Sequence, residues 1–535
     1  MSNVRGRVVR SLLVVAVLAL SLVPTVAAKW PHQRTIDVQL LAVNDLHGQI
    51  TTGRTVAGRP VGGAAYLAAY VDRERQENPR GTVLVHDGDA VGASPPVSAL
   101  LQDEPTIAIM NAMGFDLGVV GNHEFDEGVD EMFRLIRGGC HPVTDPLTGC
   151  FEGADFPYLA ANVVDTRSGR PILPPYQIQT INGVRIGFIG VVTDETPSIV
   201  IAGATEGLTF LDEAQTVNRY VDQLQRRGVQ TIVVLAHLGG FPADGVVSGE
   251  IADFANAVDD EVDVILSGHT HQGYATTIDG KLVTQAWSYS TALADVDLVI
   301  ARFTGAVVSS SGEIIDTWND AIAPDPEIAA MVAHYEQLVG PIVDEVVGVA
   351  DDDITREPSP AGEQELGNLI ADAQRWKMDT DFAFMNPGGI RADIAAGEVT
   401  WGELFSVQPF ANDLVAMDLT GDQIYRLLNQ QWQGARTRFL QISGLEVDYD
   451  PNRSAGDRIV EVRVAGGGPI DRATTYRVTV NSFLAGGGDN FTVLTEGTNR
   501  AVGPVDLDAL VDFIAQLSQP FNATIEGRID IVTTT

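Results

Sequence analysis

The chain reads Val38-Gln39-Leu40-Leu41-Ala42-Val43-Asn44-Asp45-Leu46-His47-Gly48 shortly after its first thirty residues. Its first six residues form a mostly apolar run that predicts a buried β-strand. The run then ends in Asp45 and His47, whose side chains are common metal ligands. In open α/β sheets, ligands bind just beyond the carboxyl ends of the strands. This stretch therefore predicts an α/β sheet with metal-binding groups at one strand exit.

Similar apolar runs recur along the N-terminal half of the chain. Further buried strands are predicted at Thr82–Val85, Leu117–Val120, Arg185–Val192, Thr231–Leu235 and Val262–Leu266. Helical patterns such as Gly63–Gln76 and Thr106–Met113 lie between them. Continuous apolar strands suit a sheet that is covered on both faces. A sandwich of two β-sheets flanked by helices fits this α/β pattern, and a doubly wound single sheet fits it almost as well.

Metal-ligand residue types follow four of these strands as well. The candidates at the exits are Asp87, Asp89, Asn122, His123, Asp126, His237, His269 and His271. Five of the nine histidines of the chain belong to these motifs, so chance is a poor explanation of the set. Imidazole nitrogen and carboxylate oxygen suit zinc, manganese, iron or a similar first-row ion. We expect the loops to meet at one edge of the sheet and to bind metal ions there.

The charge of the chain restricts what it can bind. Asp and Glu outnumber Lys and Arg by 71 to 34, which gives a formal net charge of −37. General nucleic-acid binding needs a basic footprint, so this balance argues against a nucleic-acid partner. An anionic small molecule must instead meet local positive charge, from bound metal ions or from a few well-placed arginines.

The first 28 residues are interpreted as a signal peptide. Arg5, Arg7 and Arg10 precede an apolar run from Ser11 to Val23, and small residues at Val26–Ala28 offer a cleavage site. The run is shorter than the roughly 20 residues that a spanning helix needs, although a single membrane anchor is the alternative. We therefore expect a secreted or extracytoplasmic protein that is free of the membrane after cleavage.

Only two cysteines occur, Cys140 and Cys150, and they flank a short segment rich in Pro, Thr and Gly. Export to an oxidising compartment favours a disulfide between them. Closing so short a loop contributes about 3 kcal/mol in the chain-entropy model. A cysteine-based metal site is a poor alternative, because two lone cysteines do not complete one.

A Pro- and Asp-rich segment, Ala323–Pro326, marks a boundary between two regions. The predicted division is a first domain at residues 34–320, a linker at 321–345 and a second domain at 346–532. The linker contains a long helical pattern at Pro326–Val343. The second region mixes helices such as Glu365–Trp376 with strands such as Tyr476–Val480, so it is expected to be α+β or α/β.

The ordered set of motifs resembles that of a known family, the calcineurin-like metallophosphoesterases. The matching motifs are Asp45-x-His47, Gly88-Asp89, Gly121-Asn122-His123-Glu124, His237 and Gly268-His269-x-His271. Asn44–Gly48 and Gly121–Asp126 resemble more narrowly the 5′-nucleotidase and UDP-sugar hydrolase branch. The C-terminal domain of that branch is similar at Leu366–Ile370, Asn386–Arg391 and Gly486–Phe491. The resemblance implies an αββα metallophosphoesterase domain followed by an α+β substrate-binding domain.

The resemblance also implies two divalent metal ions. Its ligand sets are Asp45, His47, Asp89 and His271 for one ion, and Asp89, Asn122, His237 and His269 for the other. Asp89 would bridge the ions, which agrees with the need for an anion between two close dications. His271 stands where well-known members often carry an amide side chain, so the metal preference is expected to differ.

His123 and Asp126 resemble the catalytic His–Asp pair of the family. The imidazole would stabilise the transition state or protonate the leaving alkoxide, and the carboxylate would fix its tautomer and charge. The alternative is a structural histidine behind the metal ligands.

The second domain would supply substrate specificity. Phe410 and Phe483 match the two rings that enclose the nucleobase in the family, and base stacking is worth about 1–3 kcal/mol. The remaining contacts implied by the resemblance are Asp489 to the ribose, Arg391 to the phosphate, and Asn386 and Asn412 to polar edges of the base or sugar. A further arginine that some members carry upstream of Leu366 has no clear match. Because the two sites lie on different domains, substrate would bridge them, with the linker as a hinge.

Together these features predict a secreted hydrolase that releases phosphate from nucleoside 5′-monophosphates, and possible substrates include UDP-sugars. A 2′,3′-cyclic-nucleotide phosphodiesterase with nucleotidase activity would use the same metal core and is a close alternative. A sulfur-chemistry branch of the superfamily is a more distant one. A non-catalytic extracellular nucleotide-binding protein is the alternative of another class, and the pair formed by His123 and Asp126 argues against it.

Overall fold

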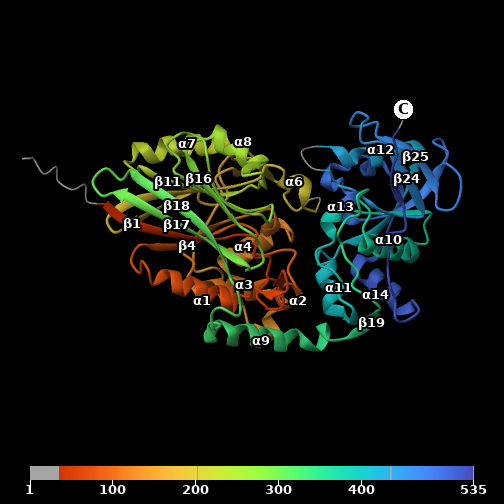
Figure 1. Cartoon of the computed structure of the whole chain (residues 1–535), viewed down its shortest axis with the longest axis horizontal. Coiled ribbons are helices and arrows are strands. Elements are labelled where there is room, and N and C mark those ends of the chain that lie inside the picture. The colour runs from red at the N-terminus through yellow and green to blue at the C-terminus, as the bar shows by residue number, and fades with distance from the viewer. Residues whose placement is uncertain (1–34, 202, 434–436, 534–535) are drawn as a thin grey trace, which may run out of the picture.

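The chain folds into two domains that lie side by side (Figure 1). This computed structural model describes residues 35–201, 203–433 and 437–533, so the predicted signal peptide lies outside the described residues. Within the described part of the chain, no helix has both the length and the apolar character needed to cross a bilayer. Helix α9 (Pro326–Val343) runs along the lower edge of the molecule in Figure 1 and leads from the first domain to the second.

The N-terminal domain contains two six-stranded sheets. The first has the order β18-β17-β1-β4-β5-β6, with β1 at Thr35–Val43, β4 at Thr82–Asp87, β5 at Leu117–Val119, β6 at Tyr158–Leu159, β17 at Ala292–Ala301 and β18 at Val307–Asp316. The second has the order β15-β16-β14-β11-β9-β8, with β8 at Tyr176–Ile181, β9 at Val184–Val192, β11 at Thr231–His237, β14 at Val264–Ser267, β15 at Gly273–Ile278 and β16 at Lys281–Ala286. The neighbours β1, β4, β5 and β6 are parallel, and so are β9, β11, β14 and β16.

The two sheets pack face to face around a shared apolar core. Alternate residues of β1 belong to different cores, because side chains of a strand point to opposite faces. Val38 and Leu40 lie between the sheets with Phe188, whereas Leu41 and Val43 lie under the outer helices. Helices α1 (Ala64–Arg75), α3 (Glu104–Met113) and α4 (Val129–Arg137) cover the first sheet, and α7 (Glu213–Arg226) and α8 (Glu250–Ala257) cover the second. The αββα sandwich is confirmed, and the doubly wound single sheet is excluded.

The C-terminal domain is built on a five-stranded and a three-stranded sheet. The larger has the order β23-β20-β26-β22-β27, with β20 at Phe382–Met385, β22 at Asp413–Thr420, β23 at Gln441–Ser443, β26 at Thr475–Asn481 and β27 at Thr498–Val505. The smaller has the order β25-β24-β28, with β24 at Leu445–Tyr449, β25 at Ile459–Val464 and β28 at Ile529–Ile531. Helices α10 (Glu365–Met378), α12 (Gly421–Asn429) and α14 (Asp506–Gln516) pack on them. Strand β26 is parallel to β20 and antiparallel to β22, so the sheet is mixed.

Shorter elements connect these parts. They are β2 (Thr55–Val56), β3 (Arg59–Pro60), α2 (Pro96–Ala99), α5 (Asp145–Thr148), β7 (Val163–Asp165), α6 (Thr196–Ile199), β10 (Leu208–Phe210), β12 (Phe241–Ala243), β13 (Val246–Ser248), β19 (Val346–Ala350), β21 (Gly397–Thr400), α11 (Trp401–Val407) and α13 (Ser482–Ala485), with 3-10 turns at η1 (His123–Phe125), η2 (Pro387–Gly389), η3 (Gln430–Trp432), η4 (Gly488–Asn490) and η5 (Thr492–Glu496).

Helix α9 has the bounds that the sequence predicts. The side chain of Asp325 caps it by accepting hydrogen bonds from the backbone N–H groups of Glu327 and Ile328. One face packs into the core of the first domain through Ile328, Val332 and Val339. The helix also contacts α11 of the second domain. It is therefore part of the first domain over most of its length, and its role as a hinge stays a prediction.

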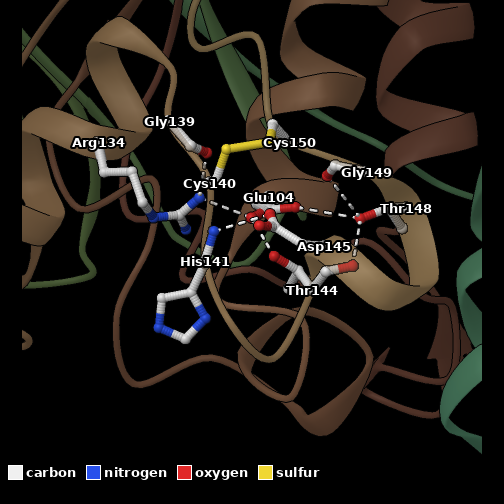
Figure 2. Close-up of a disulfide and its surroundings, with 10 residues drawn as sticks. All are labelled: Glu104, Arg134, Gly139, Cys140, His141, Thr144, Asp145, Thr148, Gly149 and Cys150. Carbon is white, nitrogen blue, oxygen red and sulfur yellow. Dashed lines mark hydrogen bonds and ion pairs between the residues drawn. A yellow bond between two sulfur atoms is a disulfide. The ribbon is translucent and has the colours of Figure 1, made fainter.

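Cys140 and Cys150 are joined by a disulfide (Figure 2). The loop that they close lies against Glu104, the first residue of α3. The Glu104 carboxylate accepts hydrogen bonds from Arg134 Nη1 and from Thr144 Oγ1, each at 2.6 Å. The loop is thus attached to both α3 and α4, on the outside of the sandwich.

Candidate active site at the domain interface

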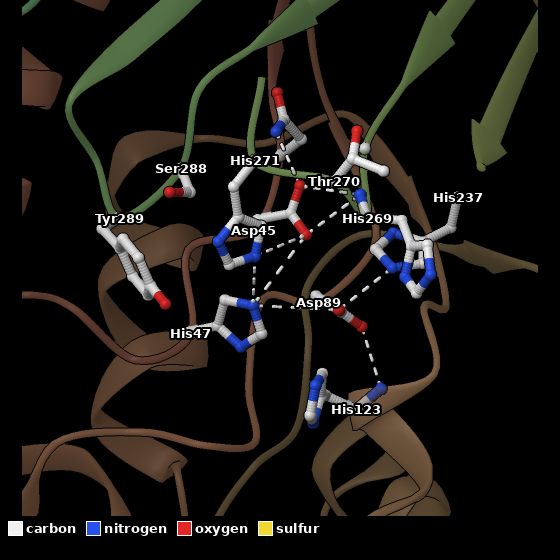
Figure 3. Close-up of polar contacts among 12 residues, drawn as sticks. Asp45, His47, Asp89, His123, His237, His269, Thr270, His271, Ser288 and Tyr289 are labelled. Atoms are coloured by element: carbon white, nitrogen blue, oxygen red, sulfur yellow. Dashed lines mark hydrogen bonds and ion pairs between the residues drawn. The ribbon is translucent and has the colours of Figure 1, made fainter. Parts of the chain in front are cut away.

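The five predicted loops meet at one edge of the β-sandwich, and Figure 3 shows their side chains turned toward one another. Strands β1, β4 and β5 of the first sheet carry Asp45, His47, Asp89 and Asn122, and strands β11 and β14 of the second carry His237, His269 and His271. The sequence predicts that the motifs meet at one sheet edge and leaves open whether there are one or two sheets. The structure shows an edge shared by two sheets, because both sets of parallel strands end there.

Asp45, His47 and His271 form a first cluster. His47 Nε2 lies 3.1 Å from His271 Nε2, and His271 Nε2 lies 3.4 Å from Asp45 Oδ1. His47 Nδ1 donates a hydrogen bond to the carbonyl oxygen of Gly92 at 2.9 Å, so its Nε2 is the nitrogen with a free lone pair. Two imidazole nitrogens and a carboxylate oxygen that converge in this way suit one shared cation.

Asp89, His237 and His269 form a second cluster. His237 Nε2 lies 3.0 Å from Asp89 Oδ2, and His237 Nδ1 donates to the carbonyl oxygen of Asp87 at 2.7 Å. One ligand atom from each of the three side chains lies within 4.8 Å of the others. Gly88 has a φ of +88°, and a Cβ there would lie 2.5 Å from His237 Nδ1, so this position needs glycine.

Asp89 connects the two clusters, because its Oδ2 atom also lies 3.8 Å from His47 Nε2. Asn122 lines the same cavity as Asp89 and His269. Its Oδ1 atom is buried, and no described residue offers it a hydrogen bond. An orphaned buried carbonyl oxygen carries a desolvation cost that a cation would offset. The donor set therefore fits two metal ions that share a carboxylate.

The ligand residues share an unusual backbone conformation. Five of them have positive φ values: Asp45 at 49°, His47 at 45°, Asp89 at 51°, His269 at 75° and His271 at 55°. Left-handed backbone is uncommon for residues other than glycine and costs about 1–3 kcal/mol each where the surroundings must enforce it. Such strain is concentrated at functional sites, and here it turns consecutive side chains of short loops toward one point.

The buried carboxylates and imidazoles of the site shift each other's pKa values toward the charged forms. Burial disfavours the charged form of His237, but Asp89 and Asp45 outweigh it and raise the pKa of His237 to about 10. Burial also opposes a charged Asp89, yet His237 and His123 hold the pKa of this carboxyl well below its usual range. The carboxylates thus attract positive charge strongly, and a divalent cation is a natural partner for them.

Glu124 is a supporting residue to which the sequence interpretation assigned no role. Its carboxylate accepts hydrogen bonds from the backbone N–H groups of Asp89, Ala90 and Gly121. Burial and then the charge of Asp89 raise the pKa of Glu124 to about 7. This one side chain links the exits of β4 and β5. The sequence did offer one sign of this role: Glu124 lies inside a motif expected to be buried, where an unpaired carboxylate is rare.

His123 lies between the metal-ligand clusters and the second domain. Its Nδ1 donates to Asp126 Oδ2 at 2.7 Å, and its backbone N–H donates to Asp89 Oδ1 at 2.8 Å. Burial lowers the pKa of His123, but Asp126 and Asp89 outweigh it and raise the value above normal. Its ring stacks on Phe410 with centroids 5.8 Å apart. The predicted pair is present, and one ring nitrogen remains to serve a substrate.

The predicted substrate residues of the second domain line the same cavity, which has a volume of about 440 Å³. They are Asn386, Arg391, Phe410, Asn412, Phe483 and Asp489. The two phenylalanine rings remain partly exposed. Asn412 Oδ1 accepts hydrogen bonds from Ser482 Oγ at 2.9 Å and from the backbone N–H of Phe483 at 3.2 Å. Asn412 therefore positions the Phe483 turn, which the sequence did not predict.

Three further residues near the cavity were not predicted. Arg438 Nε lies 3.1 Å from Asp489 Oδ1, so the candidate ribose-binding carboxylate has a cationic neighbour. The Tyr289 hydroxyl accepts a hydrogen bond from Arg391 Nη2 at 3.4 Å across the domain interface. Arg356 donates from Nη1 to the carbonyl oxygen of Ile390 at 3.3 Å, which places a second guanidinium beside Arg391. Isolated arginines and tyrosines carry no motif, so only the folded chain reveals these contacts.

Comparison with known families identifies both domains. A calcineurin-like phosphoesterase model matches residues 38–273, and a 5′-nucleotidase C-terminal domain model matches residues 346–496. Endonuclease YhcR of Bacillus subtilis is 38% identical over 93% of this chain, which spans 41% of that protein. Cell wall protein Lmo0130 of Listeria monocytogenes is 36% identical over 92% of this chain, which spans 69% of it.

A solved structure gives the same result. The 5′-nucleotidase precursor of Thermus thermophilus superimposes with a TM-score of 0.81 and 31% identity, over 94% of this chain and 100% of that one. Sequence and three-dimensional similarity thus extend over both domains. The chain belongs to the 5′-nucleotidase family of calcineurin-like phosphoesterases.

Proposed function

We propose that this protein hydrolyses nucleoside 5′-monophosphates to nucleoside and phosphate outside the cytoplasm. One observation carries the proposal: a single cavity joins the metal-ligand residues of the first domain to Phe410 and Phe483 of the second. The metal-ligand residues suit the anionic phosphate of a nucleotide, and the two rings suit its aromatic base. The similarity to a 5′-nucleotidase over both domains supports the same substrate class.

Calcineurin-like phosphoesterases use divalent metal ions, and this chain has residues that suit two of them. In the proposal, Asp45, His47, Asp89 and His271 bind one ion, and Asp89, Asn122, His237 and His269 bind the other. When bound, such ions polarise phosphoryl oxygens and make a nearby water molecule more acidic. Mixed nitrogen and oxygen ligands favour zinc, manganese or a similar first-row ion.

His123 is the proposed catalytic acid. Hydrolysis forms a P–O bond to water and breaks the ester P–O bond, and the departing 5′-oxygen then needs a proton. Nδ1 of His123 is engaged by Asp126, which holds the tautomer and favours the charged ring. The remaining Nε2–H can therefore donate to the leaving oxygen or to a phosphoryl oxygen in the transition state.

The second domain holds the rest of the nucleotide in this proposal. Phe410 and Phe483 stack on the base, and Asp489 accepts hydrogen bonds from the ribose. Arg391 has a buried Nε–H group whose hydrogen bond no described residue accepts, which suits a phosphate ligand. Asn386 forms hydrogen bonds with a polar edge of the base or sugar. This division lets one domain perform the chemistry and the other select the substrate.

An endonuclease activity is the second candidate, because the relative of 38% identity is described as an endonuclease. The formal net charge of −37 opposes binding of a polyanionic strand, and the cavity of about 440 Å³ suits one nucleotide. A 2′,3′-cyclic nucleotide is a third substrate that the same metal site would accept.

Hydrolysis of a panel of substrates tests the proposal, with released phosphate measured for the mono- and diphosphates and the products separated by chromatography or electrophoresis for the others. The panel contains the four common nucleoside 5′-monophosphates, a nucleoside diphosphate, a UDP-sugar, a 2′,3′-cyclic nucleotide and single-stranded DNA and RNA, each with Zn²⁺, Mn²⁺ or Mg²⁺. We expect the highest kcat/KM with a 5′-monophosphate. Faster cleavage of the strands would favour the endonuclease, and no turnover with any metal would favour a binding protein. Fractionation of cells that express the chain with and without residues 1–28 tests export.

A further inference from the structure

The cavity has a third wall, which belongs to the first domain and to neither group of predicted residues. Ile199 is the last residue of helix α6, and Val200 and Ile201 follow it. All three line the cavity together with Phe410 and Phe483. Aliphatic side chains have no polar atoms with which to bind a metal ion or a phosphate. The apolar character of this wall matches the base end of a nucleotide and not its phosphate end.

Val200 holds this segment in place. Its side chain is 4% exposed and belongs to the apolar core of the first domain. Ile199 and Ile201, on either side of it, are only partly buried and remain available at the cavity. The segment is thus anchored to the rigid catalytic domain by one residue and presents its two neighbours to the substrate space.

The same segment makes a contact across the domain interface. Helix α6 touches η4, the turn at Gly488–Asn490 that carries Asp489. Asp489 has a left-handed backbone with a φ of 55°, so its carboxylate direction depends on how this turn is held. In Figure 1, α6 faces the second domain near the top of the gap between the two bodies.

The opposite side of the cavity is closed differently. Helix α2 contacts α11 and α9, and Ala99 and Leu100 pack against an apolar core of the second domain. This packing lies next to α9, where the chain passes from one domain to the other (Figure 1). In Figure 1, α6 lies away from α9 along the gap, so a rotation of the domains about the α9 end would separate α6 from η4. The contact between α6 and η4 is therefore at the mouth of the cleft.

We propose that Ile199 and Ile201 form an aliphatic wall of the nucleobase subsite and that their segment closes it against η4. This inference rests on the proposed function and adds a specificity contribution from the catalytic domain. Two stacked rings cover the faces of a base, whereas its edges stay open to water. Aliphatic side chains at one edge remove that water only when the domains are closed, so base binding and closure favour each other.

The experiment compares a nucleotide with a phosphoester that lacks a base. The substrates are AMP, UMP and ribose 5-phosphate, and the variants are Ile199→Ala/Ile201→Ala and the conservative Ile199→Val/Ile201→Val. Val308→Ala, an exposed aliphatic residue of β18, is the matched control. We expect kcat/KM for the nucleotides to fall about tenfold in the double alanine variant, with an intermediate value for the valine variant. Ribose 5-phosphate should be hydrolysed at the wild-type rate.

A second measurement uses nucleosides, which can bind but contain no phosphate to be hydrolysed. Adenosine and uridine should inhibit hydrolysis of ribose 5-phosphate, and the double alanine variant should raise their inhibition constants by a similar factor. If the wild type prefers AMP to ribose 5-phosphate and the double variant keeps that preference, the assignment of Ile199 and Ile201 is wrong. Equal losses on all substrates would also overturn it. If the wild type shows no preference for AMP, the proposed nucleotidase function fails instead.

Discussion

On the catalytic-domain side of the cleft, Asp45, His47 and Asp89 are almost completely buried, whereas Phe410 and Phe483 on the other side stay partly exposed. The buried residues have left-handed backbones that short loops between strands enforce. Phe410 lies in the turn that follows α11, and Phe483 lies within the short helix α13. The surroundings fix the residues of the first side. On the second side both rings keep some exposure, although Phe483 also packs against the apolar core of its domain.

In the proposed function, this difference separates the residues that perform the hydrolysis from those that select the substrate. Ligand atoms for metal ions must be placed within a few tenths of an ångström, which burial and strained loops provide. Stacking on a base tolerates small shifts, because every base presents a flat face. Substitutions on the first side should therefore remove turnover, and those on the second should change the affinity for substrate.

The largest expected effect is that of Asp89→Asn. This change removes the carboxylate charge that both metal-ligand clusters share, so turnover should fall by on the order of 10⁴-fold or more. Elemental analysis should show that metal content falls with it. Asp530→Asn, at an exposed position in β28, is the control. Full metal content in an inactive Asp89→Asn variant would contradict the bridging role.

His123→Ala should come next, with kcat lower by about 10²–10³-fold, because a positioned acid is lost. Metal content should remain that of the wild type, since the imidazole is not among the proposed ligands. Phosphate release and elemental analysis are compared with those of His334→Ala, at an exposed position on α9. Loss of metal in the His123 variant would make this histidine a ligand.

Phe483→Ala tests the other side of the cleft. Removing one stacking ring should raise KM for AMP about tenfold and leave kcat for ribose 5-phosphate unchanged. Phe303→Ala, whose ring is 79% exposed, is the matched control. A drop in metal content or in ribose 5-phosphate turnover would break the distinction between the two sides.

The smallest effect on activity is expected for Cys140→Ser/Cys150→Ser. The disulfide closes a loop attached to α3 and α4, outside the metal-ligand loops, so activity at low temperature should stay at the wild-type level. The free energy of unfolding should fall by about 3 kcal/mol, as measured by denaturant titration. Loss of activity in a folded variant would show that the catalytic loops depend on this distant loop.

Much of the catalytic side was predictable from the sequence. Apolar strands ending in Asp, Asn and His are local patterns, and the carboxyl ends of parallel strands meet at one edge. For this reason Asp45, Asp89, His237 and His269 could be brought together before the structure was known. The number of sheets could not, because the same apolar strands suit one doubly wound sheet or two packed sheets.

Strand periodicity and loop composition are encoded locally, so they were enough to predict the two-domain α/β class and the convergence of the metal-ligand motifs. The contacts across the cleft became visible only in the folded chain. Tyr289 beside Arg391, and Ile199 and Ile201 beside the second domain, come from segments far apart in the chain. No local pattern marks them, because their proximity results from the packing of one domain on the other.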